Sequence, residues 1–214
     1  FKRLWVAFDE GTNVIDLSTM LPIVPQTDKG DIGELLSQPG VKTCCDALGR
    51  IWLITTRYVN LITFADDGNI SRIATYRYTD NTPEISVRDI EGNGNVWIGI
   101  DRGIYRMVEK NGQLIREEIS SLLKPLYGLY ITDMLKRGNV VWFSTNHGWY
   151  RYDPYLHQLE QTPTQALSHE FLSRLALMPD NTLLVGSLCG VNIYDDKTNS
   201  FTACPQGLPS APSA

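Results

Sequence analysis

The chain has 214 residues, of which 43% are hydrophobic and 20% are charged. This composition is typical of a folded globular protein and excludes disordered, collagen-like and coiled-coil chains. The formal net charge is -5 and no stretch gathers Lys and Arg, so we expect no nucleic-acid partner. No apolar run approaches the roughly 20 residues that span a bilayer. The first residues, FKRLWVAFDE, lack the pattern of a signal peptide, and we expect a mature or excised piece.

One pattern recurs along the whole chain: an apolar strand that usually carries Trp at its second position, a polar tip, and a second apolar strand. The repeat length is about 45 residues, which is typical of a solenoid or a propeller. In chain order the copies are LWVAFDEGTNVIDL from Leu4, IWLITTRYVNLITF from Ile51, VWIGIDRGIYRM from Val96, VWFSTNHGWYRYDP from Val141 and LLVGSLCGVNIYDD from Leu183.

Each of the last four copies is preceded by an alternating strand that ends in a tight polar turn. These strands begin at Val41, Ile85, Ile131 and Leu172. Gly, Asn, Asp and Pro fill the turns, as short loops between antiparallel strands require. A further strand fits after each copy, for example 73–78, 114–118 and 201–204. Four short antiparallel strands in each repeat predict an all-β fold, a β-propeller with four-stranded blades.

Two segments leave other structures open. Ser168–Met178 can be given a helical period, but it occupies the same place in its repeat as Ile131–Lys136, so we expect a strand. Asp31–Ser37 has no strand pattern, and we expect a short helical turn there. A solenoid of parallel β coils is the alternative architecture, although its coils are usually shorter and lack a hairpin at every step.

Dividing the chain by its repeat length gives a non-integer number of blades. We therefore expect an incomplete fragment of a larger propeller, of about five repeats, that spans residues 1–214. The expected blades are 1–24 (partial), 25–66, 67–110, 111–155 and 156–197, with 198–214 as the start of the next. A five-fold ring requires Phe201–Cys204 to pair with the strands between Leu4 and Leu17.

The repeats resemble those of the two-component regulator propeller family. The copies that carry the resemblance are Gly94–Tyr105 (GNVWIGIDRGIY) and Val141–Pro154 (VWFSTNHGWYRYDP). The resemblance implies the periplasmic sensor region of a hybrid two-component histidine kinase, in which propellers and a β-sandwich precede a membrane helix and the kinase. It also implies a non-catalytic domain that responds to oligosaccharides and contacts a membrane only through other parts of its parent protein.

Candidate binding residues are those that break the repeat, because one ligand site does not need five copies. The repeated Trp residues are instead expected to fill the core between sheets. The candidates for ligand contact lie at loop tips or replace a smaller residue: Arg57, Tyr58, Arg102, Asn146, His147 and Trp149.

No metal or cofactor is expected. The three histidines have no metal-ligand spacing, and the segment that begins at His169-Glu170 has Ser173 where a zinc motif needs its second His. The leading hypothesis is a sensor module that binds an oligosaccharide, with homodimerisation through propeller surfaces as a further expected contact. The alternatives are a lyase or hydrolase on a propeller scaffold, and a protein-interaction or dimerisation scaffold.

Overall fold

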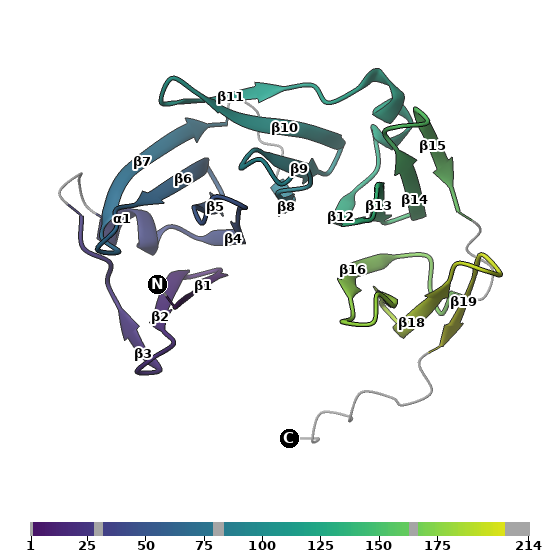
Figure 1. The fold of residues 1–214 in the computed structure, drawn as a ribbon, viewed down its shortest axis with the longest axis horizontal. Helices are drawn as coiled ribbons and strands as arrows, with labels where there is room; N and C mark the ends of the chain where they lie inside the picture. The colour runs from purple at the N-terminus through teal and green to yellow at the C-terminus, as the bar shows by residue number, and fades with distance from the viewer. Residues whose placement is uncertain (1, 28–31, 79–83, 163–166, 204–214) are drawn as a thin grey trace. The chain divides into compact units, whose positions relative to one another are not determined.

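We describe a computed structural model of the chain over residues 2–27, 32–78, 84–162 and 167–203 (Figure 1). Apart from one α-helix and one 3-10 helix, its regular elements are β-strands in five antiparallel sheets. The chain divides into two compact units, Phe1–Ile119 and Ser120–Ala214. The described helices include none that is long and apolar enough to cross a membrane.

The first unit contains three sheets and the α-helix. The first sheet has three strands, in the order β1-β2-β3, and the next two have four strands each, in the orders β4-β5-β6-β7 and β8-β9-β10-β11. Helix α1 (Ile32–Ser37) lies between the first two sheets in the sequence. The strands are β1 (Arg3–Phe8), β2 (Gly11–Asp16), β3 (Leu21–Ile23), β4 (Gly40–Cys45), β5 (Ile51–Thr55), β6 (Tyr58–Phe64), β7 (Ile70–Arg77), β8 (Glu84–Arg88), β9 (Val96–Ile100), β10 (Gly103–Lys110) and β11 (Gln113–Glu117).

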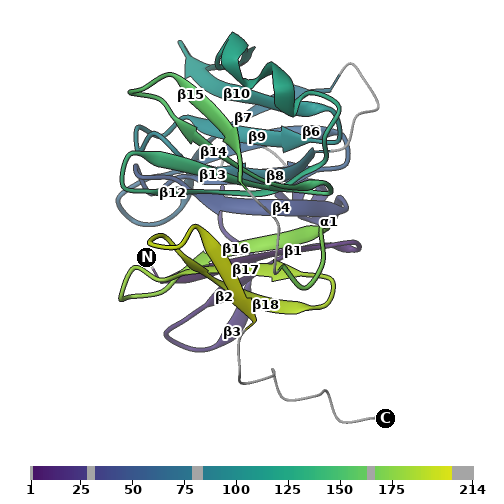
Figure 2. The ribbon, with the colours of Figure 1, turned by 90° about the vertical axis from the view of Figure 1, so that its right-hand side faces the viewer.

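The second unit contains two four-stranded sheets, in the orders β12-β13-β14-β15 and β16-β17-β18-β19 (Figure 2). The 3-10 helix η1 (Ser121–Leu126) precedes them, and the side chain of Ser120 caps it by accepting a hydrogen bond from the Leu122 amide. The strands are β12 (Ile131–Arg137), β13 (Val140–Thr145), β14 (Gly148–Asp153), β15 (Gln158–Gln161), β16 (Leu172–Leu177), β17 (Leu183–Ser187), β18 (Gly190–Asp195) and β19 (Ser200–Ala203).

These sheets are the blades of a β-propeller, which confirms the predicted fold class. The strand expected within Ser168–Met178 is present as β16, and the helical turn expected within Asp31–Ser37 is present as α1, apart from Asp31, which lies outside the described residues. The expected blade boundaries at 66, 110, 155 and 197 are wrong by one strand. Each falls between the third and fourth strands of a sheet, because β7, β11, β15 and β19 pair with the strand that precedes them.

The first sheet begins with the Trp-bearing strand. Trp5 occupies in β1 the position that Trp52 occupies in β5, so the first sheet has no counterpart of β4 among the described residues. Strand β1 pairs with β2, whereas β19 pairs with β18 in a separate sheet.

Neighbouring sheets pack through two chemically different faces. The Trp-bearing face of the first sheet, with Trp5 and Val14, packs against Ile51, Leu53 and Ile62 of the second sheet. We call these the Trp-type face and the aliphatic face, because alternate residues of a strand point to opposite sides. At the next contact Trp52 and Leu61 form the Trp-type face, and Val96, Ile98 and Met107 form the aliphatic face.

The same rule holds in the second unit. There Trp142 and Trp149 of one sheet pack against Leu183, Val185 and Tyr194 of the next. The four repeated Trp side chains are buried, with exposed fractions of 7% or less, which confirms their predicted core role: Trp5, Trp52, Trp97 and Trp142.

Gly11 lets α1 approach the first sheet closely. Its φ of +146° is rarely adopted by residues with a side chain, and a Cβ built on it would lie 2.5 Å from the Leu36 carbonyl oxygen. The β1–β2 turn therefore fixes where the end of α1 can lie.

Candidate ligand-binding site

At one end of the second sheet, the buried carboxylate of Asp46 organises the β4–β5 turn. Asp46 Oδ1 accepts hydrogen bonds from the Leu48 and Arg50 amides at 3.0 and 2.9 Å. Its Oδ2 accepts from Arg50 Nε at 2.8 Å and from Trp52 Nε1 at 2.9 Å. Each oxygen therefore has two partners, and the group serves to hold the turn and the indole in place.

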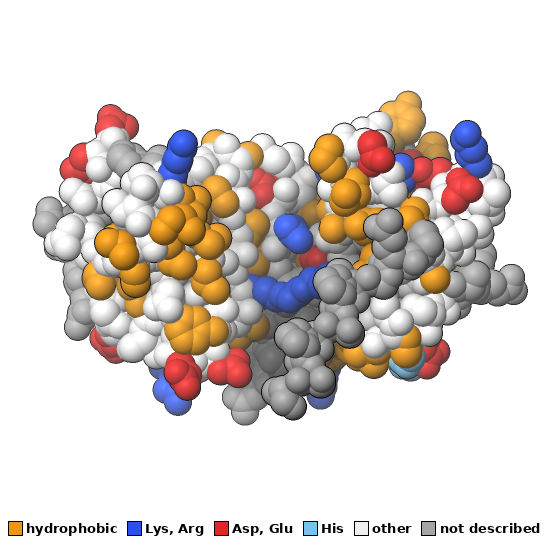
Figure 3. Space-filling model, turned by 90° about the horizontal axis from the view of Figure 1, so that it is seen from below, with side chains coloured by type: hydrophobic (Ala, Val, Ile, Leu, Met, Phe, Trp, Pro, Cys, Tyr) orange, Lys and Arg blue, Asp and Glu red, His pale blue; other side chains and the backbone are white. Residues whose placement is uncertain are grey.

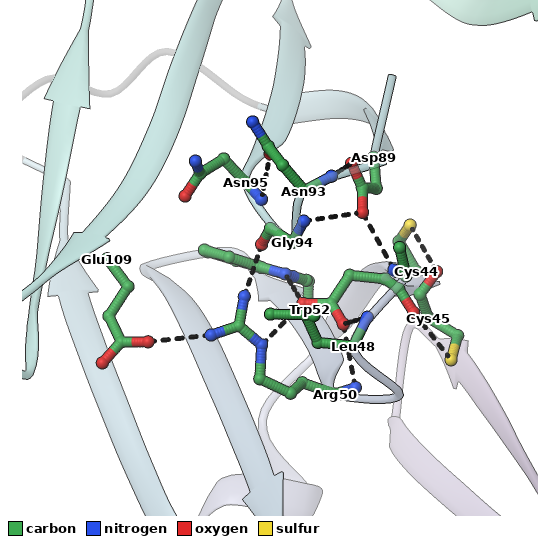
Figure 4. Close-up of polar contacts among 12 residues, drawn as sticks. Cys44, Cys45, Leu48, Arg50, Trp52, Asp89, Asn93, Gly94, Asn95 and Glu109 are labelled. Carbon is green, nitrogen blue, oxygen red and sulfur yellow. Dashed lines mark hydrogen bonds and ion pairs between the residues drawn. The ribbon is translucent and has the colours of Figure 1, made fainter. Parts of the chain in front are cut away.

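Arg50 carries this network to the third sheet. Its guanidinium donates to the Gly94 carbonyl oxygen at 2.6 Å and to Glu109 at 2.8 Å (Figure 4). Glu109 also pairs with Arg72. From the other side, Asp89 accepts a hydrogen bond from the Ala47 amide at 2.9 Å. These contacts join two blades at their turns, so this end of the sheets is stabilised by internal pairing.

Glu91 repeats the role of Asp46 one blade later. It accepts from Trp97 Nε1 at 3.0 Å and from Arg106 at 3.0 Å, and Arg106 also pairs with Glu117. Burial alone would raise the pKa of Glu91, but the hydrogen bonds from Trp97, Asn93 and Arg106 outweigh it and hold the pKa below its usual value. The carboxylate is therefore ionised at neutral pH and occupied by its partners.

The opposite end of the second sheet is open. A cleft of about 340 Å³ lies between α1 and strands β6 and β7. We call it the α1–β6–β7 cleft, and its lining residues are Glu34, Leu35, Gln38, Tyr58, Asn60, Ile73 and Thr75. Two apolar side chains, one phenol and four polar side chains give it a mixed character.

The base of the cleft is a fixed array of polar groups. Asn60 is buried, and its amide nitrogen donates to the Leu53 carbonyl oxygen at 3.3 Å, while its amide oxygen accepts from Thr75 Oγ1 at 2.9 Å. Gln38 Oε1 lies 3.2 Å from the hydroxyl of Thr55. A carboxamide can donate two hydrogen bonds and accept two, so the described contacts use half of the capacity of Asn60.

The last sheet shows how the same position looks when it is closed. Asn192 faces Val185 in the strand register as Asn60 faces Leu53. There the connection into the sheet covers the carboxamide: Asn192 Nδ2 donates to Ser168 Oγ at 3.0 Å, and its Oδ1 accepts from the Ser168 amide at 3.3 Å. In the second sheet α1 replaces that connection and leaves the carboxamide at the base of a cleft.

Of the residues singled out in the sequence, Tyr58 lines this cleft, half-buried at the start of β6. Arg57 is exposed beside it in the β5–β6 turn, and its carbonyl oxygen accepts from the Tyr78 amide. Arg102 is exposed in the β9–β10 turn, 3.9 Å from Asp101. Of the three predicted residues in the first unit, Tyr58 is therefore the one that lines the cleft.

The other three predicted residues lie in the second unit. Asn146 accepts a hydrogen bond from the Tyr130 amide at 2.9 Å, and His147 is exposed at the tip of the β13–β14 turn. The prediction that Trp149 contacts a ligand needs correction, because its side chain is fully buried. It stacks on Trp142 with ring centroids 4.3 Å apart, so its extra size fills the space between two sheets.

Gln38, Asn60 and Thr75 also line the cleft but were not among the predicted residues. The available signal was the helical segment in the connection before β4, because a connection that departs from the repeat also changes what covers the neighbouring strands.

No protein-family model matches the chain, and no curated protein matches it. Solved structures do. The chain is similar to the extracellular domain of the putative hybrid two component system BT3049 from B. thetaiotaomicron, with 15% identity and a TM-score of 0.70. It is also similar to that of BT4673 from the same organism, with 17% identity and a TM-score of 0.69. In both cases the match covers 97% of this chain and 28% of the other.

The chain is likewise similar to virginiamycin B lyase from Staphylococcus aureus, with 15% identity and a TM-score of 0.66, covering 98% of this chain and 68% of the lyase. At such identities the likeness shows the propeller fold. The same fold thus occurs in the extracellular part of two-component systems and in an enzyme.

Proposed function

We propose that this chain is part of the extracytoplasmic sensor region of a two-component signalling protein, and that it binds an oligosaccharide in the α1–β6–β7 cleft. The observation that carries the proposal is this cleft, which opens where the equivalent position of the last sheet is closed. The repeat motif and the likeness to extracellular domains of two-component systems support the sensor role. The chain's own part is ligand binding, and the histidine kinase would be supplied by the parent protein in the inner membrane.

The chemistry of the cleft suits a sugar. Hydroxyl groups both donate and accept, and Glu34, Gln38 and Asn60 offer carboxylate and amide groups that can match them. Tyr58 adds an aromatic ring at the rim, where a sugar face can pack. Arg57 in the adjacent exposed turn offers further donors to a ligand that extends beyond the cleft.

Helix α1 is suited to transmit occupancy. It forms one wall of the cleft and also packs against β2 through the close approach of Leu36 to Gly11. A ligand that binds one position of α1 better than another shifts the population toward that position. In this proposal the first sheet moves with α1, and the signal is a change in how the two pack.

Isothermal titration against a panel of oligosaccharides tests the proposal, using this chain and the longer extracytoplasmic region of its parent. We expect one glycan class to bind both, and Tyr58→Ala to weaken its binding about tenfold or more. Tyr155→Ala is the matched control, because Tyr155 is 84% exposed in the β14–β15 turn and should leave binding unchanged.

The outcomes separate function from site. If no glycan binds either protein, the oligosaccharide part of the proposal fails. If a glycan binds and Tyr58→Ala does not weaken it, the ligand lies elsewhere and the cleft assignment fails. If a candidate lyase or hydrolase substrate is turned over, the non-catalytic part of the proposal fails.

A further inference from the structure

The described blades carry exposed surface of two kinds. Hydrophobic side chains gather over the first sheet, on the left of Figure 3, and the exposed ones of β1 include Leu4 and Val6. The equivalent positions in the second sheet, Ile51 and Leu53, are buried against the preceding sheet, so this apolar surface is of the kind that packs blades together. The floor of the α1–β6–β7 cleft is polar, and its counterpart in the last sheet is filled differently.

In the last sheet a single serine fills the place that the cleft leaves open. Ser168 lies in the connection before β16, and its hydroxyl accepts a hydrogen bond from Asn192 Nδ2 at 3.0 Å. Its backbone amide donates to Asn192 Oδ1 at 3.3 Å, and its hydroxyl also lies 2.7 Å from that of Ser187. One residue therefore supplies both a donor and an acceptor to the same carboxamide.

The second sheet presents the same two receiving groups. Asn60 stands where Asn192 stands in the strand register. Thr55 and Ser187 end β5 and β17, and each hydroxyl donates to the first carbonyl oxygen of the next strand, at 3.3 and 3.1 Å. Gln38 Oε1 takes the contact with Thr55 that Ser168 makes with Ser187. Within the described part of the chain, Asn60 has no counterpart of Ser168.

The missing group is small, and its chemistry is specified. Asn60 is 1% exposed at the floor of the cleft, so only a small group can reach it. Its contacts with Leu53 and Thr75 leave one N–H on Nδ2 and one lone pair on Oδ1. In Ser168 the groups that meet these are an amide N–H and a hydroxyl on neighbouring carbon atoms. A ligand that replaces Ser168 needs the same pair.

An N-acetylated amino sugar contains this fragment. Its acetamido N–H and the adjacent ring hydroxyl stand on neighbouring carbons, as the amide and hydroxyl of serine do, and its acetyl group corresponds to the residue before the serine. In the last sheet that residue is Leu167, which packs against the core. In the cleft, Leu35 and Ile73 offer apolar contact to an acetyl methyl group. A sugar with plain hydroxyl groups has no methyl group for these two side chains.

We infer that the α1–β6–β7 cleft recognises an N-acetylated amino sugar unit of the oligosaccharide. The acetamido N–H donates to Asn60 Oδ1, and the neighbouring hydroxyl accepts from Asn60 Nδ2, so Asn60 determines the specificity of the site. The inference rests on the proposed function, because it names the sugar class for that same cleft.

Two matched pairs of methyl glycosides test the inference in titrations followed by heteronuclear NMR. The pairs are N-acetylglucosamine with glucose and N-acetylgalactosamine with galactose, whose members differ only in the acetamido group. We expect an acetamido sugar to bind about tenfold or more tightly than its partner, since a methyl group in an apolar pocket discriminates to that degree. The side-chain amide signals of Asn60, identified by their absence from Asn60→Asp, should shift as it binds.

Asn60→Asp keeps the size of the side chain and removes the donor to the sugar hydroxyl. We expect it to weaken binding of the acetamido sugar about tenfold or more. Asn192→Asp is the matched control, because it makes the same change where Ser168 already fills the site, and it should leave binding unchanged. Thermal unfolding shows whether both variants are folded. The comparison of matched sugars on the wild-type chain decides the specificity even if Asn60→Asp does not fold.

The outcomes separate this inference from the proposed function. If glycans without an acetamido group bind as tightly as the acetamido sugars, the inference fails and the proposed function stands. If an acetamido sugar binds and a folded Asn60→Asp chain binds it as the wild type does, the role of Asn60 fails. If neither these sugars nor the wider panel of oligosaccharides binds, the inference and the oligosaccharide part of the proposed function fail together.

Discussion

Removal of the Asp46 carboxylate tests whether the turn network stabilises the first unit. Asp46→Ala removes four hydrogen bonds and the buried half of an ion pair, because the Asp46 side chain has no exposed surface. Trp52 is likewise fully buried, so its Nε1 donor loses its partner where water does not replace it. Arg50 keeps Gly94 and Glu109 as partners, which limits the loss.

The expected cost follows from these contacts. An unsatisfied buried donor costs about 1–3 kcal/mol, and breaking a buried ion pair by removing one partner costs about 3–5 kcal/mol. We therefore expect Asp46→Ala to lower the free energy of unfolding by about 3–5 kcal/mol. At about 2–4 °C per kcal/mol for a chain of this size, the melting temperature should fall by roughly 6–20 °C.

Glu91→Ala is the internal comparison. Glu91 caps Trp97 in the same way, but its side chain is 29% exposed, so water replaces part of what is lost. We expect a cost of about 1 kcal/mol. Urea unfolding followed by Trp fluorescence and far-ultraviolet circular dichroism measures both. The reasoning would be refuted if Asp46→Ala lowered the free energy of unfolding by less than Glu91→Ala does. It would also be refuted if Asp46→Ala cost as much in a chain that carries Trp52→Phe as it does in the wild-type chain.

Four further predictions concern single residues. The ionised form of Glu91 stabilises the fold fully above the ordinary pKa of 4.5, and this stabilisation is lost as the pH falls through the lowered pKa of the folded state. Between pH 7 and pH 3, the melting temperature of Glu91→Gln should therefore fall less than that of the wild-type chain. Trp149→Ala should cost about 3–5 kcal/mol in urea unfolding, whereas a surface residue would cost under about 0.5 kcal/mol. Gly11→Ala should lower the melting temperature, because the new methyl meets the backbone of α1. Cys45 is exposed, but partial desolvation of its side chain raises the pKa of the thiol. Its labelling by a disulfide reagent should therefore be slower at pH 7 than that of free cysteine and should keep rising beyond pH 9.

The propeller was predictable because each blade must solve the same packing problem. Every sheet needs a large side chain between itself and its neighbour, so Trp recurs at one position, and short antiparallel strands need polar turns. The blade boundaries were not predictable from that repeat. The spacing of Trp52 and Trp97 fixes the repeat length. It does not say whether β7, which lies between them, pairs with the strand before it or with the strand after it; in the structure it pairs with β6, the strand before it.

The predicted binding residues were chosen because they differ from their equivalents in the other repeats, and this criterion identified only part of the cleft. Looking for departures from the repeat found Tyr58, which does line the cleft. The same rule chose Trp149, where the departure is a larger core residue whose ring stacks on Trp142. A side chain that differs from its repeat equivalents marks a difference in local packing, and burial decides whether that difference faces a ligand or a neighbouring sheet.

The cleft arises because a different segment lies over the sheet, and not because the strands of the sheet differ. Asn60 and Asn192 sit at the same place in two blades and both donate to the carbonyl oxygen opposite them. What distinguishes them is the connection into each sheet: Ser168 satisfies one carboxamide, and α1 leaves the other at the base of an open space. Because connections vary without disturbing the core between sheets, a propeller can open a site in one blade while the packing of a Trp-type face on an aliphatic face within each unit stays the same.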